Sequence, residues 1–279
     1  MPDDYDMTSG RREDDRPDSL TVIGIALLAY AVANFLHEGV GHGGACVLLG
    51  GEPEVLSSVH FECDAGAATM RGVAAAGTIV NFVIGALALV ALHSIRVKES
   101  PHRYYFTWLF ATLNLLMGAG YFLFSGAGDI GDWAVVAEGS APAWLWRPAM
   151  AVFGAALYFW LARQSARALR QLTGGDEHGA ARGRRLALPA YFAGGLLYCV
   201  SGLMNPVGPI LIAVSAAAAS FGGASGLLWL TALLRHFDGP AEAVRLDRRR
   251  GWIAAGLVAA ALFIGLLGPA IEFGGESPP

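Results

Sequence analysis

The chain has 279 residues, of which 54% are hydrophobic and only 15% are Asp, Glu, Lys or Arg. With a mean hydropathy of +0.48, this composition excludes an ordinary soluble domain and indicates a polytopic membrane protein. The net charge of −4 says little about partners because the charged residues cluster outside the apolar segments. We expect membrane lipids as partners and no nucleic acid.

The chain begins with an acidic, polar stretch and continues with seven apolar segments. Residues 1–19 lack the apolar core of a signal peptide, and we expect them to form a disordered cytoplasmic tail. Most of the apolar segments have about the 20 residues that cross a bilayer as a helix. They are Leu20–Leu36 (continuing to about Leu49), Gly72–Leu92, Tyr104–Ala127, Ala143–Ala162, Leu186–Met204, Val207–Leu234 and Trp252–Ile271. The sixth is overlong, and we expect a tilt or kink at Gly222 and Gly223. Residues 272–279 are expected to form a short tail.

The basic residues predict the orientation of these helices. If all seven segments cross and the N-terminus is cytoplasmic, 17 of the 19 Lys and Arg residues lie on the cytoplasmic side, and only Arg71 and Arg147 lie outside. This distribution satisfies the positive-inside rule. We therefore expect an all-α polytopic membrane protein with its C-terminus outside. Lys98 is the only lysine, and this bias, together with abundant Ala and Gly, indicates the cell membrane of a GC-rich bacterium.

One short motif concentrates polar chemistry in the first apolar segment. Glu38 lies between His37 and His42 in the pattern His-Glu-x-x-x-His. A charged acid in hydrocarbon is costly, and a bound metal ion would compensate its charge. The zinc-hydrolase motif His-Glu-x-x-His is one residue shorter and places both histidines on one helix face. Residues five positions apart instead point roughly 140° apart on a straight α-helix, so they could not bind one ion. A single π-helical turn would return both histidines to one face. Four glycines make that distortion cheap: Gly39, Gly41, Gly43 and Gly44.

Two acidic residues after the third apolar segment are candidates for a third metal ligand. A catalytic zinc ion has three protein ligands and one open position for water. In the predicted topology the histidines lie in the outer half of the membrane, and Asp129 and Asp132 follow the outer end of the third helix. We favour Asp132 and keep Asp129 open. The alternatives are a metal-free packing cluster for the histidines and solvated loop residues for the acids.

Further residues on this side have candidate roles. Glu38 would act as the general base. Asn81, in the second apolar segment, would stabilise an oxyanion or form an interhelical hydrogen bond. His60, in the first outer loop, would be a loop residue or an accessory ligand.

The first outer loop, between residues 50 and 70, has a partly alternating stretch at 54–62. This pattern indicates a short strand or hairpin, which would lie over the site and hold an extended peptide by strand addition. A plain polar loop is the alternative. Cys46, Cys63 and Cys199 are too few for a disulfide framework, and we expect a packing role for Cys46 rather than a bridge to Cys63.

These motifs resemble the site-2 protease family of intramembrane zinc metalloproteases. That family places His-Glu-x-x-His on one transmembrane helix and an Asp ligand on a later one, often with a Gly-x-x-x-Asn-like element between them. Here Gly77 to Asn81 matches that element. The resemblance covers a three-helix core at residues 20–135, while residues 136–271 form four further helices without a matching motif. The longer spacing is similar to the His-Glu-x-x-x-His motif of dipeptidyl peptidase III-type zinc peptidases, so we expect a divergent relative.

The resemblance implies a Zn²⁺ cofactor and cleavage of a transmembrane or membrane-proximal peptide. Two other classes remain open at the level of the sequence. One is a metal-dependent membrane hydrolase of a lipid or small amphiphile. The other is a non-catalytic membrane transporter or scaffold.

Overall fold

A computed structural model describes residues 16–139, 142–208, 212–237 and 241–273. Within these residues, seven helices are long and apolar enough to cross a membrane. The expected all-α polytopic fold is therefore confirmed. Most of the expected N-terminal tail, and all but the first two residues of the expected C-terminal tail, lie outside the described residues.

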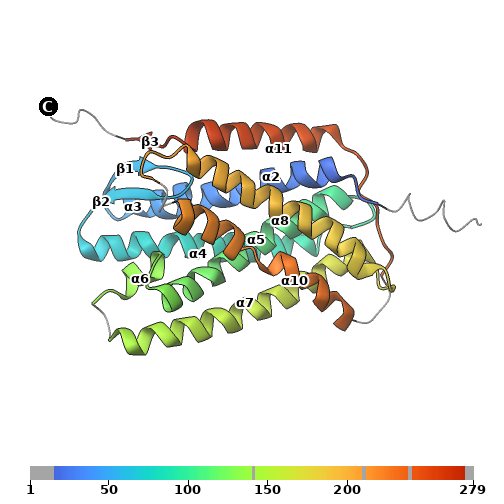
Figure 1. The fold of residues 1–279 in the computed structure, drawn as a ribbon, viewed down its shortest axis with the longest axis horizontal. Helices are drawn as coiled ribbons and strands as arrows, with labels where there is room; N and C mark the ends of the chain where they lie inside the picture. Colours follow the sequence, from blue (N-terminus) through green and yellow to red (C-terminus); the bar gives the residue numbers. More distant parts are fainter. Residues whose placement is uncertain (1–15, 140–141, 209–211, 238–240, 274–279) are drawn as a thin grey trace, which may run out of the picture.

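The helices run roughly side by side along one direction (Figure 1). The first span is continuous and consists of α2 (Ser19–Phe35), the π-helix η1 (Leu36–Gly43) and α3 (Gly44–Leu48). It is followed by α4 (Ala67–Leu92), α5 (Pro101–Gly128), the short α6 (Asp132–Ala137), α7 (Ala143–Thr173) and α8 (Gly179–Leu203). The remaining helices are η2 (Ile212–Gly222), α10 (Gly226–Leu233), η3 (Leu234–His236), α11 (Arg250–Leu262) and η4 (Phe263–Leu267).

Several helix ends differ from the apolar segments. Asp18 caps α2, accepting a hydrogen bond of 2.9 Å from the Thr21 amide, so the helix begins within the expected tail. The fourth helix continues to Thr173 because its basic residues reach the polar end of the bundle, where Arg163 and Arg167 lie over the Phe237 ring. The sixth span is broken at residues 223–225, between η2 and α10, which confirms the expected interruption.

The first outer loop forms a hairpin of β1 (Glu52–Leu56) and β2 (Phe61–Asp64), as the alternation predicted. A third strand, β3 (Ile271–Glu272), pairs antiparallel with the other edge of β1, so the strand order is β2-β1-β3. This strand corrects two expectations. The seventh transmembrane helix ends at Leu267 rather than residue 271, and Glu272 belongs to a sheet rather than to a free tail.

A disulfide joins Cys46 at the end of the first span to Cys63 in β2. The expectation of a packing role for Cys46 was wrong. The hairpin folds back over α3 and brings the two Cα atoms to 6.1 Å, within the range that a disulfide spans. This pairing depends on the path of the intervening loop, which spacing alone does not reveal.

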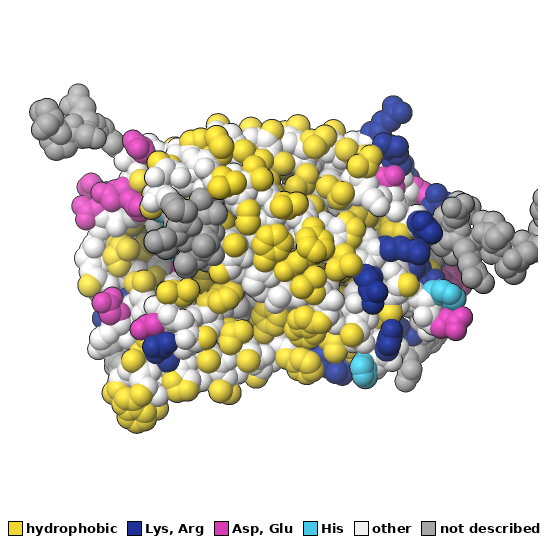
Figure 2. All heavy atoms as spheres, viewed as in Figure 1, with side chains coloured by type: hydrophobic (Ala, Val, Ile, Leu, Met, Phe, Trp, Pro, Cys, Tyr) yellow, Lys and Arg dark blue, Asp and Glu magenta, His cyan; other side chains and the backbone are white. Residues whose placement is uncertain are grey.

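Charged side chains separate to the two ends of the bundle. Figure 2 shows a largely apolar belt, with Lys and Arg concentrated at the end where the described chain begins. Acidic side chains gather at the opposite end, beside the hairpin and β3 (Figures 1 and 2). The distribution agrees with the orientation inferred from the positive-inside rule. Disulfides persist in oxidising compartments outside the cytoplasm, so the bridge at the hairpin end favours the same orientation.

Polar anchors hold the buried helix α5 in the middle of the bundle. The Trp108 indole donates a hydrogen bond of 2.8 Å to the Ser165 carbonyl on α7. The Tyr105 hydroxyl donates one of 2.9 Å to the Leu186 carbonyl on α8. These contacts fix the helix whose outer end leads to Asp132.

Candidate metal centre

The motif histidines lie on a π-helical turn, as the glycine-rich spacing predicted. Residues 36–43 form η1, and His37 and His42 are 4% and 7% exposed. Their Nε2 atoms lie 3.1 Å apart. The wider turn therefore places residues five apart on one face, which a regular α-helix does not.

A close backbone crossing between η1 and α4 makes room for the two imidazoles. A Cβ added at Gly41 would lie 2.6 Å from the Gly77 Cα. A Cβ at Gly77 would lie 2.6 Å from both the His37 Cε1 and the His42 Nε2 atoms. Only glycine fits at position 77, so this residue forms the floor of the cluster.

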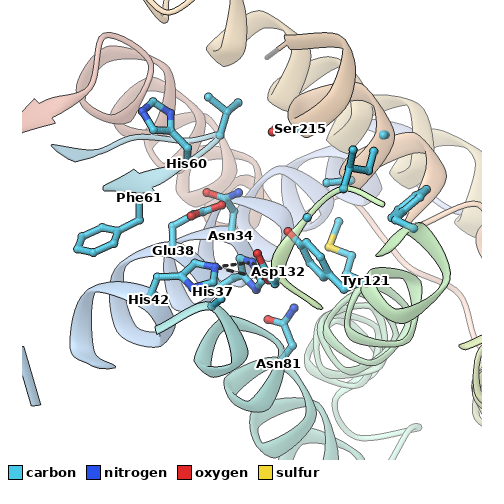
Figure 3. A pocket seen from close by; sticks show the side chains of 18 of the residues that line it. Asn34, His37, Glu38, His42, His60, Phe61, Asn81, Tyr121, Asp132 and Ser215 are labelled. Atoms are coloured by element: carbon cyan, nitrogen blue, oxygen red, sulfur yellow. Dashed lines mark hydrogen bonds and ion pairs between the residues drawn. The ribbon is translucent and has the colours of Figure 1, made fainter. Parts of the chain in front are cut away.

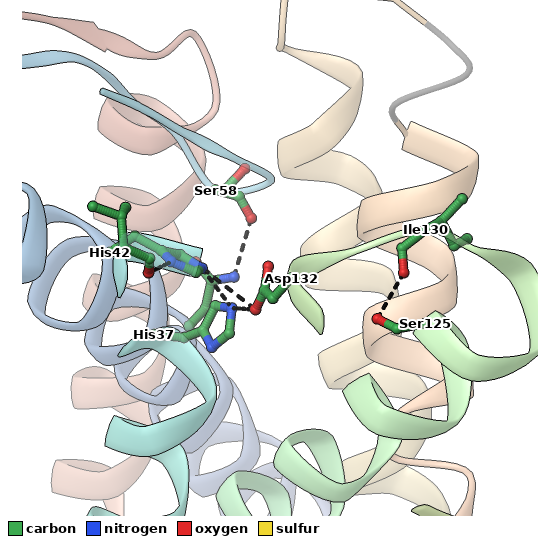
Figure 4. Close-up of polar contacts among 8 residues, drawn as sticks. His37, His42, Ser58, Ser125, Ile130 and Asp132 are labelled. Carbon is green, nitrogen blue, oxygen red and sulfur yellow. Dashed lines mark hydrogen bonds and ion pairs between the residues drawn. The ribbon is translucent and has the colours of Figure 1, made fainter. Parts of the chain in front are cut away.

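Asp132 is brought to the histidines by a tight turn after α5. Asp129 and Gly131 have φ values of +57° and +81°, and the Ser125 hydroxyl donates a hydrogen bond of 2.9 Å to the Ile130 carbonyl (Figure 4). The chain reverses here and starts α6 with Asp132. The Asp132 Oδ2 atom lies 3.5 Å from the His37 Nε2 and 3.6 Å from the His42 Nε2.

Asp129, the other candidate ligand, is not brought to this cluster. Its left-handed conformation directs it elsewhere, and its Oδ2 lies 3.8 Å from the Arg147 Nη1. Its side chain is 50% exposed, whereas that of Asp132 is 16% exposed. The geometry therefore selects Asp132 from the two acids that the sequence left open.

The donor set fits a metal ion of the size of zinc. A tetrahedral ion with bonds of about 2.0–2.1 Å separates its ligand atoms by about 3.3 Å. The separations here are 3.1, 3.5 and 3.6 Å. The Val73 carbonyl lies 2.7 Å from the His42 Nδ1 and accepts a hydrogen bond from its N–H, which leaves the Nε2 lone pair free for a metal. The Asp132 Oδ2 is buried, and none of the described residues forms a hydrogen bond with it. The buried His37, His42 and Asp132 can thus hold one ion.

Burial changes the acidity of the Asp132 carboxyl group. Desolvation raises the pKa of Asp132 to about 6, while the nearby His42 imidazole opposes the rise. A metal ion supplies the opposite charge that this buried carboxylate lacks.

The cluster borders a cavity of about 270 Å³ that also contains Glu38 and Asn81 (Figure 3). Glu38 is 6% exposed, and it lines the same cavity as His37. Asn81 is 2% exposed, and its Oδ1 has no hydrogen-bond partner among the described residues. Both residues predicted to act in catalysis therefore line one cavity with the three metal-binding candidates.

His60 lines the cavity but is not one of the three clustered ligands. Its Nδ1 lies 2.8 Å from the Ser57 hydroxyl, and its Nε2 lies 3.2 Å from a Glu62 carboxylate oxygen. These contacts belong to the hairpin turn. The accessory-ligand alternative thus has no geometric support, and the loop interpretation fits.

Sequence reasoning missed several parts of the cavity wall. Tyr121 on α5 stacks against His37, and the later helices contribute Tyr198, Ser215, Ala218 and Ala219. No motif distinguishes these side chains from the apolar residues around them. The later helices are therefore part of the site, although no sequence motif indicated this.

The later helices also hold the hairpin over the cavity through Ser58. The Ser58 amide donates to the Leu267 carbonyl at 2.9 Å, and the Ser201 hydroxyl donates to the Ser58 hydroxyl at 2.8 Å. The Asn34 amide donates to the Ser58 carbonyl at 3.1 Å (Figure 4). The first, fifth and seventh spans are thereby tied to one loop residue.

Comparisons of the chain with protein-family models, curated proteins and solved structures find no match. The functional argument therefore depends on the residues and the geometry of this site.

Proposed function

We propose that the chain is an intramembrane zinc metalloprotease that hydrolyses peptide bonds in or near the membrane. The observation that carries the proposal is the meeting of His37, His42 and Asp132 from two separate parts of the chain, with their ligand atoms within 4.8 Å of one another. Buried ionisable groups in a membrane-spanning bundle are costly and mark functional sites. Glu38 in the same cavity adds the base that hydrolysis requires.

The residues divide the reaction between them. When bound, zinc supplies Lewis-acid chemistry, which activates water and polarises a carbonyl group. Glu38 takes a proton from a water molecule as the water oxygen adds to the peptide carbonyl carbon. Glu38 then returns this proton to the leaving nitrogen as the carbon–nitrogen bond breaks. The Asn81 amide would donate an N–H to the carbonyl oxygen as that oxygen becomes negative.

The hairpin supports a peptide as the substrate. Strand β1 lies between its two partners, so β2 is an edge strand of the sheet. Its first residue, Phe61, and the preceding His60 line the cavity. An edge strand next to a catalytic cavity fits an extended peptide through backbone hydrogen bonds. A hydrolase of lipids or small amphiphiles would need the same ligands but no such strand.

The orientation of the helices and the composition of the chain support a location in the bacterial cell membrane. In that orientation the cavity opens near the outer surface, where the hairpin and the disulfide lie. A transmembrane or membrane-proximal segment of another protein would reach the cavity at this depth.

The experiment that tests the proposal starts with metal content. We expect about one zinc ion per chain in protein purified in detergent without chelators, and its loss in His37→Ala and His42→Ala. His93→Ala is the matched control, because His93 is exposed and bonds only within its own helix, to the Leu89 carbonyl. A wild-type chain that takes up no zinc under these conditions contradicts the proposal.

Activity is then measured with Glu38→Gln, which should keep zinc and lose turnover. Membrane-spanning peptides in liposomes are the first substrates, and the liposome lipids are assayed for hydrolysis in the same samples. Zinc-dependent, Glu38-dependent peptide cleavage supports the protease. Lipid hydrolysis without peptide cleavage favours the hydrolase alternative, and zinc binding with neither reaction favours a non-catalytic protein.

A further inference from the structure

Tyr121 packs directly against one of the proposed metal ligands, His37. Its ring stacks on the His37 imidazole, with 4.7 Å between the ring centroids and 11° between the planes. The residue lies on α5, the third span, whereas His37 lies on the first. Figure 3 shows the Tyr121 side chain directed toward the cluster from α5.

The two histidines are held in different ways. The ring of His42 is fixed by a hydrogen bond from its Nδ1 to the Val73 carbonyl, at 2.7 Å. The Nδ1 of His37 is buried and forms no hydrogen bond of comparable geometry within the described residues, although the ring lies close to the Gly77 backbone. Ligand histidines usually donate their second N–H to a fixed acceptor, which sets the ring orientation. His37 has only a weaker backbone contact, with Gly77, so ring packing contributes to its orientation.

Two aromatic contacts supply that packing. Tyr121 covers one face of the imidazole, and His42 meets it edge-on, with 4.6 Å between centroids and 86° between planes. Both distances fall in the range of favourable aromatic pairs. The orientation of the His37 ring therefore depends in part on Tyr121.

The Tyr121 ring also contacts the turn that carries the third ligand. A Cβ added at Gly131 would lie 3.7 Å from the Tyr121 Cδ1, which is ordinary van der Waals contact. Gly131 precedes Asp132 directly. One side chain thus packs between the first ligand and the turn that places the third.

Tyr121 lines the cavity, and its hydroxyl is not engaged in any hydrogen bond seen among the described residues. It lies close enough to Glu38 and Asp132 to interact with both carboxylates electrostatically. A phenolic O–H is a hydrogen-bond donor, and buried tyrosines usually use theirs. This donor therefore lies in the same cavity as the proposed base and a proposed ligand.

We propose that Tyr121 serves the site in two ways: its ring positions His37 as a metal ligand, and its hydroxyl donates a hydrogen bond to the substrate carbonyl oxygen as that oxygen becomes negative. The second role rests on the proposed function. The first depends only on metal binding. In the second role Tyr121 on α5 acts together with Asn81 on α4.

The test uses two substitutions that separate ring from hydroxyl. Tyr121→Phe keeps the stacked ring and removes the donor, whereas Tyr121→Leu removes both. Tyr104→Phe is the matched control. Tyr104 lies on α5 far from Tyr121, and its hydroxyl donates a hydrogen bond to the Ala168 carbonyl on α7. Zinc affinity is measured on each full-length protein by competition with a chromogenic chelator. The visible spectrum of Co²⁺-loaded protein reports the ligand geometry.

For the ring, we expect Tyr121→Leu to bind zinc about 10- to 100-fold more weakly, as loss of a supporting contact does, and to alter the Co²⁺ spectrum. Tyr121→Phe should restore both to the wild-type values. Unchanged affinity and spectrum in Tyr121→Leu would overturn the positioning role.

For the hydroxyl, we expect Tyr121→Phe to lower kcat about 100-fold, the loss typical of one oxyanion donor, with little change in KM. A kcat equal to that of Tyr104→Phe overturns this role. If the wild-type chain binds zinc but cleaves no peptide, the hydroxyl role falls with the proposed function. The zinc and Co²⁺ measurements still decide the positioning role.

Discussion

The Nε2 atoms of His37 and His42 lie 3.1 Å apart although the two residues are five positions apart in the chain. The π-helical turn over residues 36–43 makes this possible, and the glycines in and after the motif permit the turn. A glycine on the neighbouring helix, Gly77, then leaves the space that both rings occupy. The inserted residue is therefore compatible with metal binding.

Gly77→Ala should damage the metal centre selectively. Its new Cβ would lie 2.6 Å from an atom of each imidazole, and forcing one methyl group into a packed site costs about 1–3 kcal/mol. We expect zinc affinity to fall roughly tenfold to a hundredfold. Gly44→Ala is the control, because a Cβ there meets nothing within 4 Å. Equal zinc affinity in the two variants would show that the two imidazoles can bind the metal without a glycine at position 77.

Replacing Asp132 and Asp129 separately should show which of the two carboxylates binds the metal. Asp132→Asn removes an anionic ligand, and we expect a loss of zinc affinity greater than the roughly 10- to 100-fold that a lost supporting contact costs. Asp129→Asn should leave the affinity unchanged, because that carboxylate faces Arg147. Zinc content after dialysis against a weak chelator measures both. The opposite order of the two variants would mean that the turn after α5 is arranged differently when metal is bound.

The sequence predicted the crossings well because apolar length and basic residues are local signals. The π-turn was also predictable, since the glycines that permit it lie inside the motif. The choice between Asp129 and Asp132 was not, because it depends on left-handed backbone angles at 129 and 131. Tyr121 and the Cys46–Cys63 bridge depend on contacts between distant segments, and no periodicity encodes these.

Zinc affinity should fall as the pH drops below 6. Burial raises the pKa of Asp132 to about 6, so its carboxylate is mostly ionised at pH 7 and mostly protonated at pH 5. A metal ion must displace that proton at low pH. This group alone should weaken apparent affinity by about tenfold per unit below pH 6.

The Asp132→Asn variant isolates the contribution of this carboxyl group. Protonation of the histidines also weakens binding in acid, but it affects both proteins. We expect the pH dependence of log affinity to be shallower in the variant by about one proton between pH 4 and pH 6. Equal slopes, measured by calorimetry in two buffers, would mean that Asp132 releases no proton on binding.

Removing the disulfide should loosen the hairpin without removing the metal. The bridge joins residues separated by 17 positions, and closing a loop of that size stabilises the folded form by about 3 kcal/mol in the chain-entropy description. In the double variant Cys46→Ser/Cys63→Ser, we expect faster amide exchange in residues 52–64 and lower peptide turnover. Zinc content should stay near the wild-type value, because none of the three ligands lies in the hairpin. Cys199→Ser is the control, since this cysteine is outside the bridge.

The hairpin retains the Ser58 hydrogen bonds and its pairing with β3 in the double variant, so the chain should remain folded. Unchanged exchange and turnover would show that those tethers alone hold the hairpin over the cavity. Loss of zinc would show that the bridge also shapes the π-turn, which ends at Gly43, directly before the helix α3 that carries Cys46.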